Sequence, residues 1–376
     1  MPPSPPSLTR ACPPRNACPS WSRRGRSGPP GRRSGAASGP TSRTRVPTRS
    51  RARKRLVPSA PVSPETLVRG RLADHPIWSR TLADVRLPAR LLQPVIVSAR
   101  VEDRERVPDA PWLERLSITE LVRDARAAAS AGLAGLLVFG MSDRKDETAM
   151  LASERDHVVT RAIHAVKDAA PDLAIATDVC VCAYTQHGQC VLFKEGNADV
   201  AGTLARLAEI ALVHADAGAD LLVPSGMLEG TVAALHSALA NVGRDVPVAP
   251  VVKLETKLYA SHRRAVEAMP INERAVPLID AAERDGVRAR AVREVAAGAD
   301  AIVMKPGLVA LDHVMRVAGS AGRPVFSFFT ADEHALYANN EALPDGAALE
   351  REAIAAARRA GADFVISYGA FAVAES

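Results

Sequence analysis

Short apolar runs recur along the chain from residue 90 onward and alternate with longer, alanine-rich stretches. Each run has the length of a buried strand, and each stretch between two runs is long enough for a helix. Because a helix that connects two neighbouring strands makes them parallel, the alternation predicts a parallel sheet. The eight runs occupy residues 93–99, 135–140, 173–180, 220–225, 247–253, 300–306, 324–330 and 363–369.

Eight such strands are the number that closes a (β/α)₈ barrel, so we expect this α/β fold, known as the TIM barrel. A repeated tetrapeptide supports the pattern, because residues 217–220, 297–300 and 360–363 all read Ala-Gly-Ala-Asp. Residues 131–134 are a looser copy, and each copy places a glycine where a helix is expected to end before a strand. The alternative is an open, doubly wound sheet, but no G-x-G-x-x-G motif follows the first run to indicate a dinucleotide site.

Residues 1–64 form a leader of different composition, with 14 basic residues, no acidic residue and 14 of the 28 prolines. A segment so poor in apolar residues cannot offset the entropy lost on ordering, so we expect it to be disordered. An over-extended translation start is the favoured explanation, ahead of a transit peptide or a basic tail that binds nucleic acid. Residues 65–376 are expected to form the catalytic barrel domain.

The net charge of +6 is misleading, because the leader has 14 basic and no acidic residues while the rest of the chain is acidic. Residues 65–376 carry 34 basic and 42 acidic side chains, a net charge of −8, so we expect no nucleic-acid partner except through the leader. No run of eighteen apolar residues occurs, and no apolar signal region follows the leader. We therefore expect a cytoplasmic protein without a membrane-spanning helix.

Reactive side chains gather where the expected strands end, which is where the active site of a (β/α)₈ barrel lies. Two of these residues are lysines on neighbouring strands, and burial would lower the pKa of a lysine by penalising its ammonium form. A neutral lysine can attack a ketone to form a Schiff base, although a single strand-end lysine is more often a solvated or phosphate-binding cation. The strand-end residues are Asp178, Cys180, Cys182, Ser225, Lys253, Lys305, Thr330 and Tyr368.

Three cysteines lie within eleven residues, in the pattern C-x-C-x₇-C formed by Cys180, Cys182 and Cys190. Three thiolates from one turn can bind one Zn²⁺ and leave its fourth position open, as in catalytic zinc sites. The alternative is a set of buried structural cysteines. We expect His187, in the same segment, to orient the loop rather than to bind the metal.

These motifs together resemble the porphobilinogen synthase family, also called 5-aminolevulinate dehydratase. The resemblance rests on the strings DVCVCAYTQHGQC, VPSGMLEG, VMKPGLVALD and AGADFVISYGAFA, and it extends in order from about residue 90 to residue 374. It implies a (β/α)₈ barrel, usually a homo-octamer, that condenses two molecules of 5-aminolevulinate into porphobilinogen for haem biosynthesis. It also implies Zn²⁺ as the metal, with Mg²⁺ as a second candidate.

The resemblance assigns the Schiff bases to Lys253 and Lys305. Lys253 fits better than Lys257, because Tyr259 and Arg263 then follow at the family's spacing of six and ten residues. Lys305 would hold the substrate that supplies the propionate side, and Tyr259 would contact substrate.

Further roles follow from the same resemblance. Arg263 and Arg274 would bind the carboxylate of the other substrate, for which the planar guanidinium is well suited. Tyr368 would bind the first carboxylate, while Asp178 would be catalytic and Ser225 would line the site.

The chain departs from the family motifs at three places. Gly226 replaces an aspartate, and Ala331-Asp332-Glu333 replaces Ser-Gly-Glu, so that a hydroxyl is lost unless Thr330 substitutes for it. The lid motif Phe-Tyr-Gly-Pro-Phe-Arg becomes Leu-Tyr-Ala-Ser-His-Arg at residues 258–263. The alternatives to the family reaction are a divergent paralogue that joins other amino-ketones or acts as a Schiff-base aldolase, and a non-catalytic barrel that binds zinc.

Deletion of residues 1–60 should leave the barrel folded, because the leader lacks the apolar residues to contribute to a core. Soluble yield and the thermal midpoint of the truncated chain, measured beside the full chain, test this expectation. Loss of soluble protein would contradict it. Reduced assembly with an unchanged midpoint would identify part of the leader as an oligomerisation arm.

Overall fold

The computed structural model describes residues 70–339 and 345–376, so the expectations for the leader lie outside the described residues. Within this part, eight parallel strands confirm the predicted (β/α)₈ barrel, and each coincides with one of the eight apolar runs. The barrel strands are β1 (Leu91–Ser98), β4 (Gly135–Met141), β5 (Ala174–Val179), β8 (Leu221–Pro224), β9 (Val251–Lys253), β10 (Ile302–Lys305), β11 (Val325–Phe328) and β12 (Phe364–Ile366).

The strands pair in chain order, and β12 pairs with β1 to bring the last strand beside the first. The remaining gap, between β8 and β9, is bridged just before β9 begins. There the Leu222 amide donates to the Pro247 carbonyl at 2.9 Å, and the Ala249 amide donates to the Leu222 carbonyl at 2.8 Å. The sheet therefore closes, which excludes the open doubly wound alternative.

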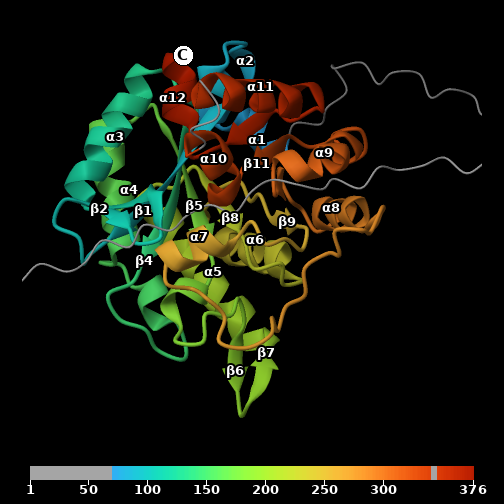
Figure 1. Cartoon of the computed structure of the whole chain (residues 1–376). Coiled ribbons are helices and arrows are strands. Elements are labelled where there is room, and N and C mark those ends of the chain that lie inside the picture. Colours follow the sequence, from blue (N-terminus) through green and yellow to red (C-terminus); the bar gives the residue numbers. More distant parts are fainter. Residues whose placement is uncertain (1–69, 340–344) are drawn as a thin grey trace, which may run out of the picture. The chain divides into compact units, whose positions relative to one another are not determined.

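Helices follow the barrel strands and lie around them in Figure 1. Their inward faces are apolar and their outward faces polar, which is the pattern of helices that cover a buried sheet. The helices that follow successive strands are α3 (Ile118–Ser130), α4 (Val158–Ala169), α5 (Val200–Ala217), α6 (Thr231–Asn241), α8 (Gly286–Ala296), α9 (Leu311–Ala318), α11 (Gly346–Arg359) and α12 (Ala370–Glu375). The shorter helices are α1 (Gly70–Asp74), α2 (Pro76–Ala83), α7 (Ala260–Ala265) and α10 (Ala331–Ala338).

The repeated Ala-Gly-Ala-Asp tetrapeptides join helices to strands in the way the sequence predicts. Gly218, Gly298 and Gly361 all have φ near +105°, a conformation that favours glycine because it has no Cβ. The aspartate at the end of each tetrapeptide connects neighbouring strands. Its carboxylate accepts a hydrogen bond from a backbone amide at or just before the start of the neighbouring strand. These bonds join Asp220 to Ile175, Asp300 to Val248 and Asp363 to Val325, at 2.8 to 3.0 Å.

The amino ends of the strands are closed by Trp78 of α2, which is fully buried. Its ring packs edge-on against Phe326 and Phe364, and its indole N–H donates to the Asp220 carbonyl at 2.9 Å. Because this end is filled by aromatic side chains, the carboxyl ends of the strands are left for chemistry.

Two hairpins were not predicted from the sequence. One consists of β2 (Arg104–Val107) and β3 (Ala110–Leu116), and β3 extends the sheet beside the end of β1. The other consists of β6 (Leu192–Lys194) and β7 (Asn197–Asp199) and projects away from the barrel in Figure 1. Polar residues interrupt the apolar ones in both hairpins, which read RERV and APWLERL in the first and LFK and NAD in the second, so neither has the continuous apolar run that marks a barrel strand.

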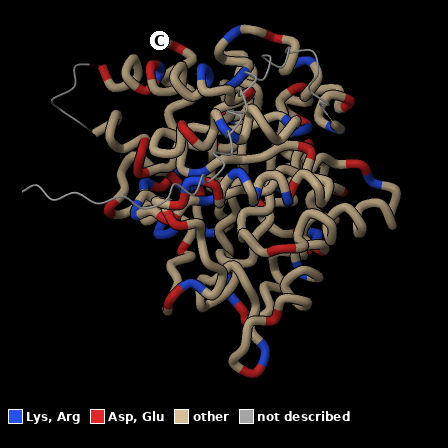
Figure 2. Tube along the Cα trace, turned by 90° about the vertical axis from the view of Figure 1, so that its right-hand side faces the viewer, with Lys and Arg blue, Asp and Glu red and all other residues tan. Residues whose placement is uncertain are grey.

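Among the described residues, every helix is too short or too polar to cross a bilayer. Basic and acidic residues are interspersed along the described chain in Figure 2 rather than separated by sign.

Candidate active site

A cavity of about 50 Å³ lies at the carboxyl ends of six barrel strands, from β4 to β11. The cavity is small beside typical ligand pockets of about 300 to 1,000 Å³, and one segment of the chain covers it. That covering segment follows β9 and contains α7. Nine of the eleven residues predicted for the site line the cavity, namely Asp178, Cys182, Cys190, Ser225, Lys253, Tyr259, Arg263, Arg274 and Lys305.

Lys253 and Lys305 are paired directly across β9 and β10, where the register brings their Cα atoms opposite each other. Successive residues of a strand point to opposite faces, so paired residues on neighbouring strands project their side chains from the same face. Both side chains line the cavity. Lys257, the alternative in the sequence alignment, is exposed and lies outside the cavity lining.

Lys305 is buried, with 7% of its surface exposed. Its Nζ atom lies 3.8 Å from the ring centroid of Phe328 and 5.6 Å from that of Tyr259. Burial, followed by the positive charge of Lys253, lowers the pKa of Lys305 to about 7. A substantial fraction of this amine is therefore neutral and nucleophilic near neutral pH.

Lys253 is half-buried, and its ammonium donates to the Ser225 carbonyl oxygen after β8. Asp178, at the end of β5, contributes the nearby acidic group. Burial raises the pKa of Asp178 to about 6, and the Ser225 hydroxyl and Lys253 offset part of this effect. The Asp178 Oδ1 atom is buried and makes no hydrogen bond to the described residues, so this carboxyl is free to exchange a proton with a bound molecule.

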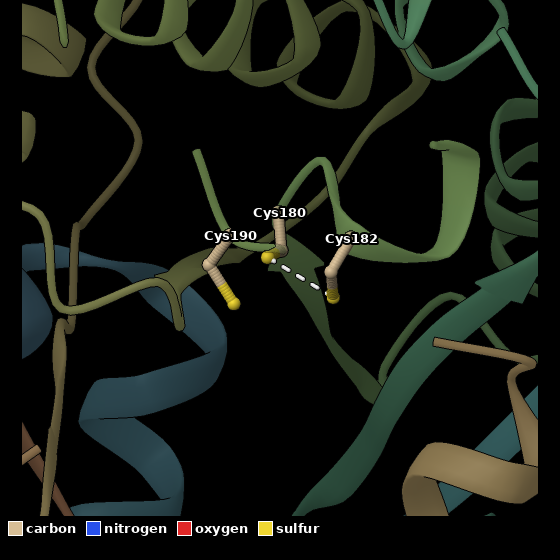
Figure 3. Close-up of side chains that lie close together, drawn as sticks. All are labelled: Cys180, Cys182 and Cys190. Atoms are coloured by element: carbon tan, nitrogen blue, oxygen red, sulfur yellow. Dashed lines mark hydrogen bonds between the residues drawn. The ribbon is translucent and has the colours of Figure 1, made fainter. Parts of the chain in front are cut away.

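The three cysteines meet on one side of the cavity, and their side chains point into a common space in Figure 3. The Sγ atoms all lie within 4.8 Å of one another, and those of Cys180 and Cys182 are 3.3 Å apart. Thiolates that share one tetrahedral Zn²⁺ at 2.3 Å have sulfur atoms about 3.8 Å apart, so the trio fits such an ion after small side-chain adjustments.

The charges around the sulfur atoms suit a metal as well. Hydrogen bonds from Cys180 and Cys182 lower the pKa of the Cys190 thiol well below its usual value. Arg263 hydrogen-bonds to Cys190, and its positive charge compensates the charge of the thiolate. His187 is not part of the trio, since its Nδ1 atom accepts from the Gln189 amide at 3.0 Å and so orients the loop.

Two arginines lie beside the thiols. Arg263, in α7, donates to the Ala268 carbonyl at 3.0 Å, and Arg274 follows in the loop beyond the helix. Burial and the charge of Arg263 lower the pKa of Arg274. Two cations held together in this way favour binding of an anion such as a carboxylate.

Cys180 and Tyr368 are the two predicted site residues that do not line the cavity. Cys180 is a buried member of the thiol trio, and the other two cysteines of the trio line the cavity. The hydroxyl of Tyr368 lies 2.8 Å from Nδ1 of His262, and His262 does line the cavity. His262 stands between Tyr368 and the cavity, a position that the sequence did not suggest.

The departures from the family motifs have direct consequences here. Thr330 lines the cavity, but its hydroxyl oxygen already accepts from the Glu333 amide at 3.0 Å as the cap of α10. Buried Glu333 accepts from the amides of Thr330, Gly307 and Leu308, which fixes the loop after Lys305. At Gly226, an added Cβ would lie 3.3 Å from the Cβ and carbonyl oxygen of Cys190, so an aspartate there would press on the thiol trio.

The chain matches a family model described as delta-aminolevulinic acid dehydratase over residues 69–376. The delta-aminolevulinic acid dehydratase of Methanothermobacter thermautotrophicus is 34% identical over 307 residues, which are 79% of this chain and 93% of that relative. The enzyme of the same name from Escherichia coli is 30% identical over 290 residues, 76% of this chain and 89% of that relative. The fold also matches the crystal structure of a Toxoplasma gondii delta-aminolevulinic acid dehydratase (porphobilinogen synthase) in complex with its reaction product porphobilinogen. That match has a TM-score of 0.74 at 25% identity and covers 84% of this chain and 92% of the other.

The lowered pKa of Lys305 predicts how its reactivity changes with pH. Reductive methylation of Lys305 by formaldehyde and cyanoborohydride should rise between about pH 6 and pH 8 and then level off, because the neutral amine predominates above its pKa of about 7. Peptide mass spectrometry measures the modified fraction, with exposed Lys194 as an internal reference. Lys253→Met removes a neighbouring positive charge and should move the midpoint to higher pH. Reactivity at Lys305 that keeps rising above pH 9 would contradict the expectation.

Proposed function

Because the chain belongs to the delta-aminolevulinic acid dehydratase family, we propose that its strand-end cavity condenses two molecules of 5-aminolevulinate into porphobilinogen. The reaction joins the substrates through one carbon–carbon and one carbon–nitrogen bond and releases two molecules of water. It makes the protein a lyase of tetrapyrrole biosynthesis. The observation that carries the residue assignment is the pair of lysines that face each other across β9 and β10.

Lys305 binds the first substrate. Its neutral amine attacks the ketone, and loss of water leaves an imine between Nζ and the former carbonyl carbon. The lowered pKa of Lys305 supports this role, because an ordinary lysine is almost fully protonated at neutral pH. The rings of Phe328 and Tyr259 exclude water around the amine and limit its orientations.

Lys253 binds the second substrate as a second imine on the neighbouring strand. Because the lysines are in register, two imines formed on them lie close enough for their carbon skeletons to be joined. Arg263 and Arg274, at the thiol side of the cavity, bind the carboxylate of this second substrate. A carboxylate would offset the repulsion between the two guanidinium groups.

Asp178 exchanges the protons that imine formation and ring closure require. A pKa raised to about 6 lets one carboxyl both accept and donate a proton near neutral pH. Its free Oδ1 atom and the Ser225 hydroxyl beside it line the space between the lysines. Ser225 therefore orients the carboxyl and the bound substrate.

Cys180, Cys182 and Cys190 would hold a metal ion, for which Zn²⁺ is the first candidate because thiolates are its preferred soft ligands. Bound there, Zn²⁺ supplies a Lewis acid for the amino group or carbonyl oxygen of the second substrate. Mg²⁺ prefers oxygen ligands, so a role for it would require a different site. We also propose that the protein forms a homo-oligomer, an octamer as in the family, and that it is cytoplasmic.

A divergent paralogue that acts on other amino-ketones is the second candidate. It is favoured by the cavity wall near Lys305, where His262 separates Tyr368 from the cavity and no hydroxyl is present at Ala331. A non-catalytic barrel is less well supported, because such a protein has no physical need to bury the lysine pair and the arginine pair.

Incubation of the protein with 5-aminolevulinate and zinc should yield a pyrrole that reacts with an aldehyde colour reagent. Borohydride added during turnover should reduce the imine and leave a covalent adduct on Lys305, on Lys253 or on both, which peptide mass spectrometry locates. Lys305→Met should abolish pyrrole formation, while Lys257→Met is the matched control and should retain it. An adduct on Lys257 would show that the register assigned here is wrong, and turnover of another amino-ketone alone would favour the paralogue.

Protein purified without a chelator should contain about one zinc ion per active chain. The double substitution Cys180→Ala/Cys182→Ala should abolish zinc binding, because only one thiolate would remain. Elemental analysis measures the bound metal, and Val181→Ala is the control because it changes the same loop without removing a thiol. Unchanged zinc in the double variant would place the metal elsewhere.

A further inference from the structure

His262 lies in the wall of the cavity that Lys305 also lines. The imidazole packs edge-on against Phe139 of β4, with ring centroids 4.4 Å apart, and its Nδ1 atom lies 2.8 Å from the Tyr368 hydroxyl. Phe139 in turn lies beside Phe328, with ring centroids 6.3 Å apart, and the Lys305 Nζ atom lies 3.8 Å from the Phe328 centroid. The ring therefore lies near the lysine pair and belongs to the wall of their cavity.

The hydrogen bond between His262 and Tyr368 determines whether the other ring nitrogen, Nε2, carries a proton. A phenol is the stronger acid of the two, so its O–H donates to the imidazole nitrogen in the favoured arrangement. Nδ1 is then the acceptor, and in a neutral ring Nε2 must carry the proton. Burial lowers the pKa of His262 well below its usual value, which keeps the ring neutral.

Among the described residues, the hydrogen bond found for this ring is the one between Nδ1 and the Tyr368 hydroxyl, so Nε2 is the nitrogen left for a bound molecule. Because His262 lines the cavity and Tyr368 does not, Nε2 is the donor of this pair that a bound molecule reaches. Thr330 lines the same cavity, with its hydroxyl oxygen already accepting from the Glu333 amide. The wall near Lys305 thus presents a neutral N–H donor suited to an acceptor such as a carboxylate oxygen.

The helix that carries His262 is fixed at a second point. Ser261 donates through both its amide and its hydroxyl to the carboxylate of Asp332, at the start of α10. The contacts of Ser261 and His262 tie α7 to α10 and to the segment after β12. The imidazole is consequently held in place before a substrate binds, which reduces the entropy lost on binding.

We propose that His262 is a specificity-determining residue, whose Nε2–H binds the carboxylate tail of the ketone held by Lys305. Tyr368 is then a positioning residue, which fixes the tautomer and the orientation of the imidazole. The inference rests on the proposed Schiff base at Lys305. It assigns to His262 a contact that the resemblance to the family gives to Tyr368.

Two simple ketones test the proposal, namely 4-oxopentanoate, which has a carboxylate tail, and its methyl ester, which has none. Each forms an imine on Lys305 with loss of water, and borohydride supplies the hydride that reduces the imine to a stable secondary amine. The measurement is the ketone concentration that gives half-maximal labelling of Lys305, read by peptide mass spectrometry. His262→Phe should raise this concentration about tenfold to a hundredfold for the acid and change it little for the ester.

Two further variants separate recognition from packing. His262→Gln retains an N–H donor, so it should recover part of the preference for the acid. Tyr368→Phe should weaken that preference less than His262→Phe does, because the donor remains but loses its partner. Labelling of Lys305 by the ester serves in each variant as the control for an intact site.

Three outcomes would overturn the inference, and they differ in what they say of the proposed function. Equal losses for acid and ester in His262→Phe would mean that the ring only shapes the cavity. An unchanged preference for the acid would mean that the carboxylate binds elsewhere, while Lys305 remains the Schiff-base lysine. Failure of the wild-type protein to be labelled by either ketone would overturn both proposals.

Discussion

The repulsion between Lys253 and Lys305 is the constraint on which the rest of the site depends. Two amines in register on neighbouring strands, one of them buried, cannot both keep their protons without a large electrostatic cost. Burial and the neighbouring Lys253 lower the pKa of Lys305 to about 7, so about half of this amine is neutral near pH 7, while the Lys253 side chain donates to the Ser225 carbonyl. The asymmetry allows a nucleophile and a cation to lie side by side.

On the opposite side of the cavity, the thiol trio gathers negative charge that a nearby cation has to compensate. Three thiols in contact concentrate negative charge on Cys190, and Arg263 lies against them as the compensating cation. Because Arg263 lies in α7, the segment that covers the cavity also supplies charge to the thiol trio. A substrate carboxylate at Arg263 and Arg274 would be part of the same charge balance.

The barrel could be predicted because its signals are local. The apolar runs mark the strands, and the glycine of each Ala-Gly-Ala-Asp repeat marks the end of a helix, as the φ of +107° at Gly361 illustrates. The sequence also located the residues that line the cavity, since topology brings strand ends together whatever their separation along the chain. The hairpin of β6 and β7 was missed because two strands of three residues each are too short to show a strand periodicity.

The contact between His262 and Tyr368 could not be predicted, since 106 residues separate the two and neither has a local signal for the other. The same holds for Ser261 and Asp332. Ser261, His262 and Asp332 stand where the chain departs from the family motifs. In the structure these three residues take part in two side-chain contacts, one between Ser261 and Asp332 and one between His262 and Tyr368. A proline in place of Ser261 or a glycine in place of Asp332 would remove the side-chain bond between α7 and α10. The departures are therefore connected in space, because they join α7 to α10 and to the segment after β12.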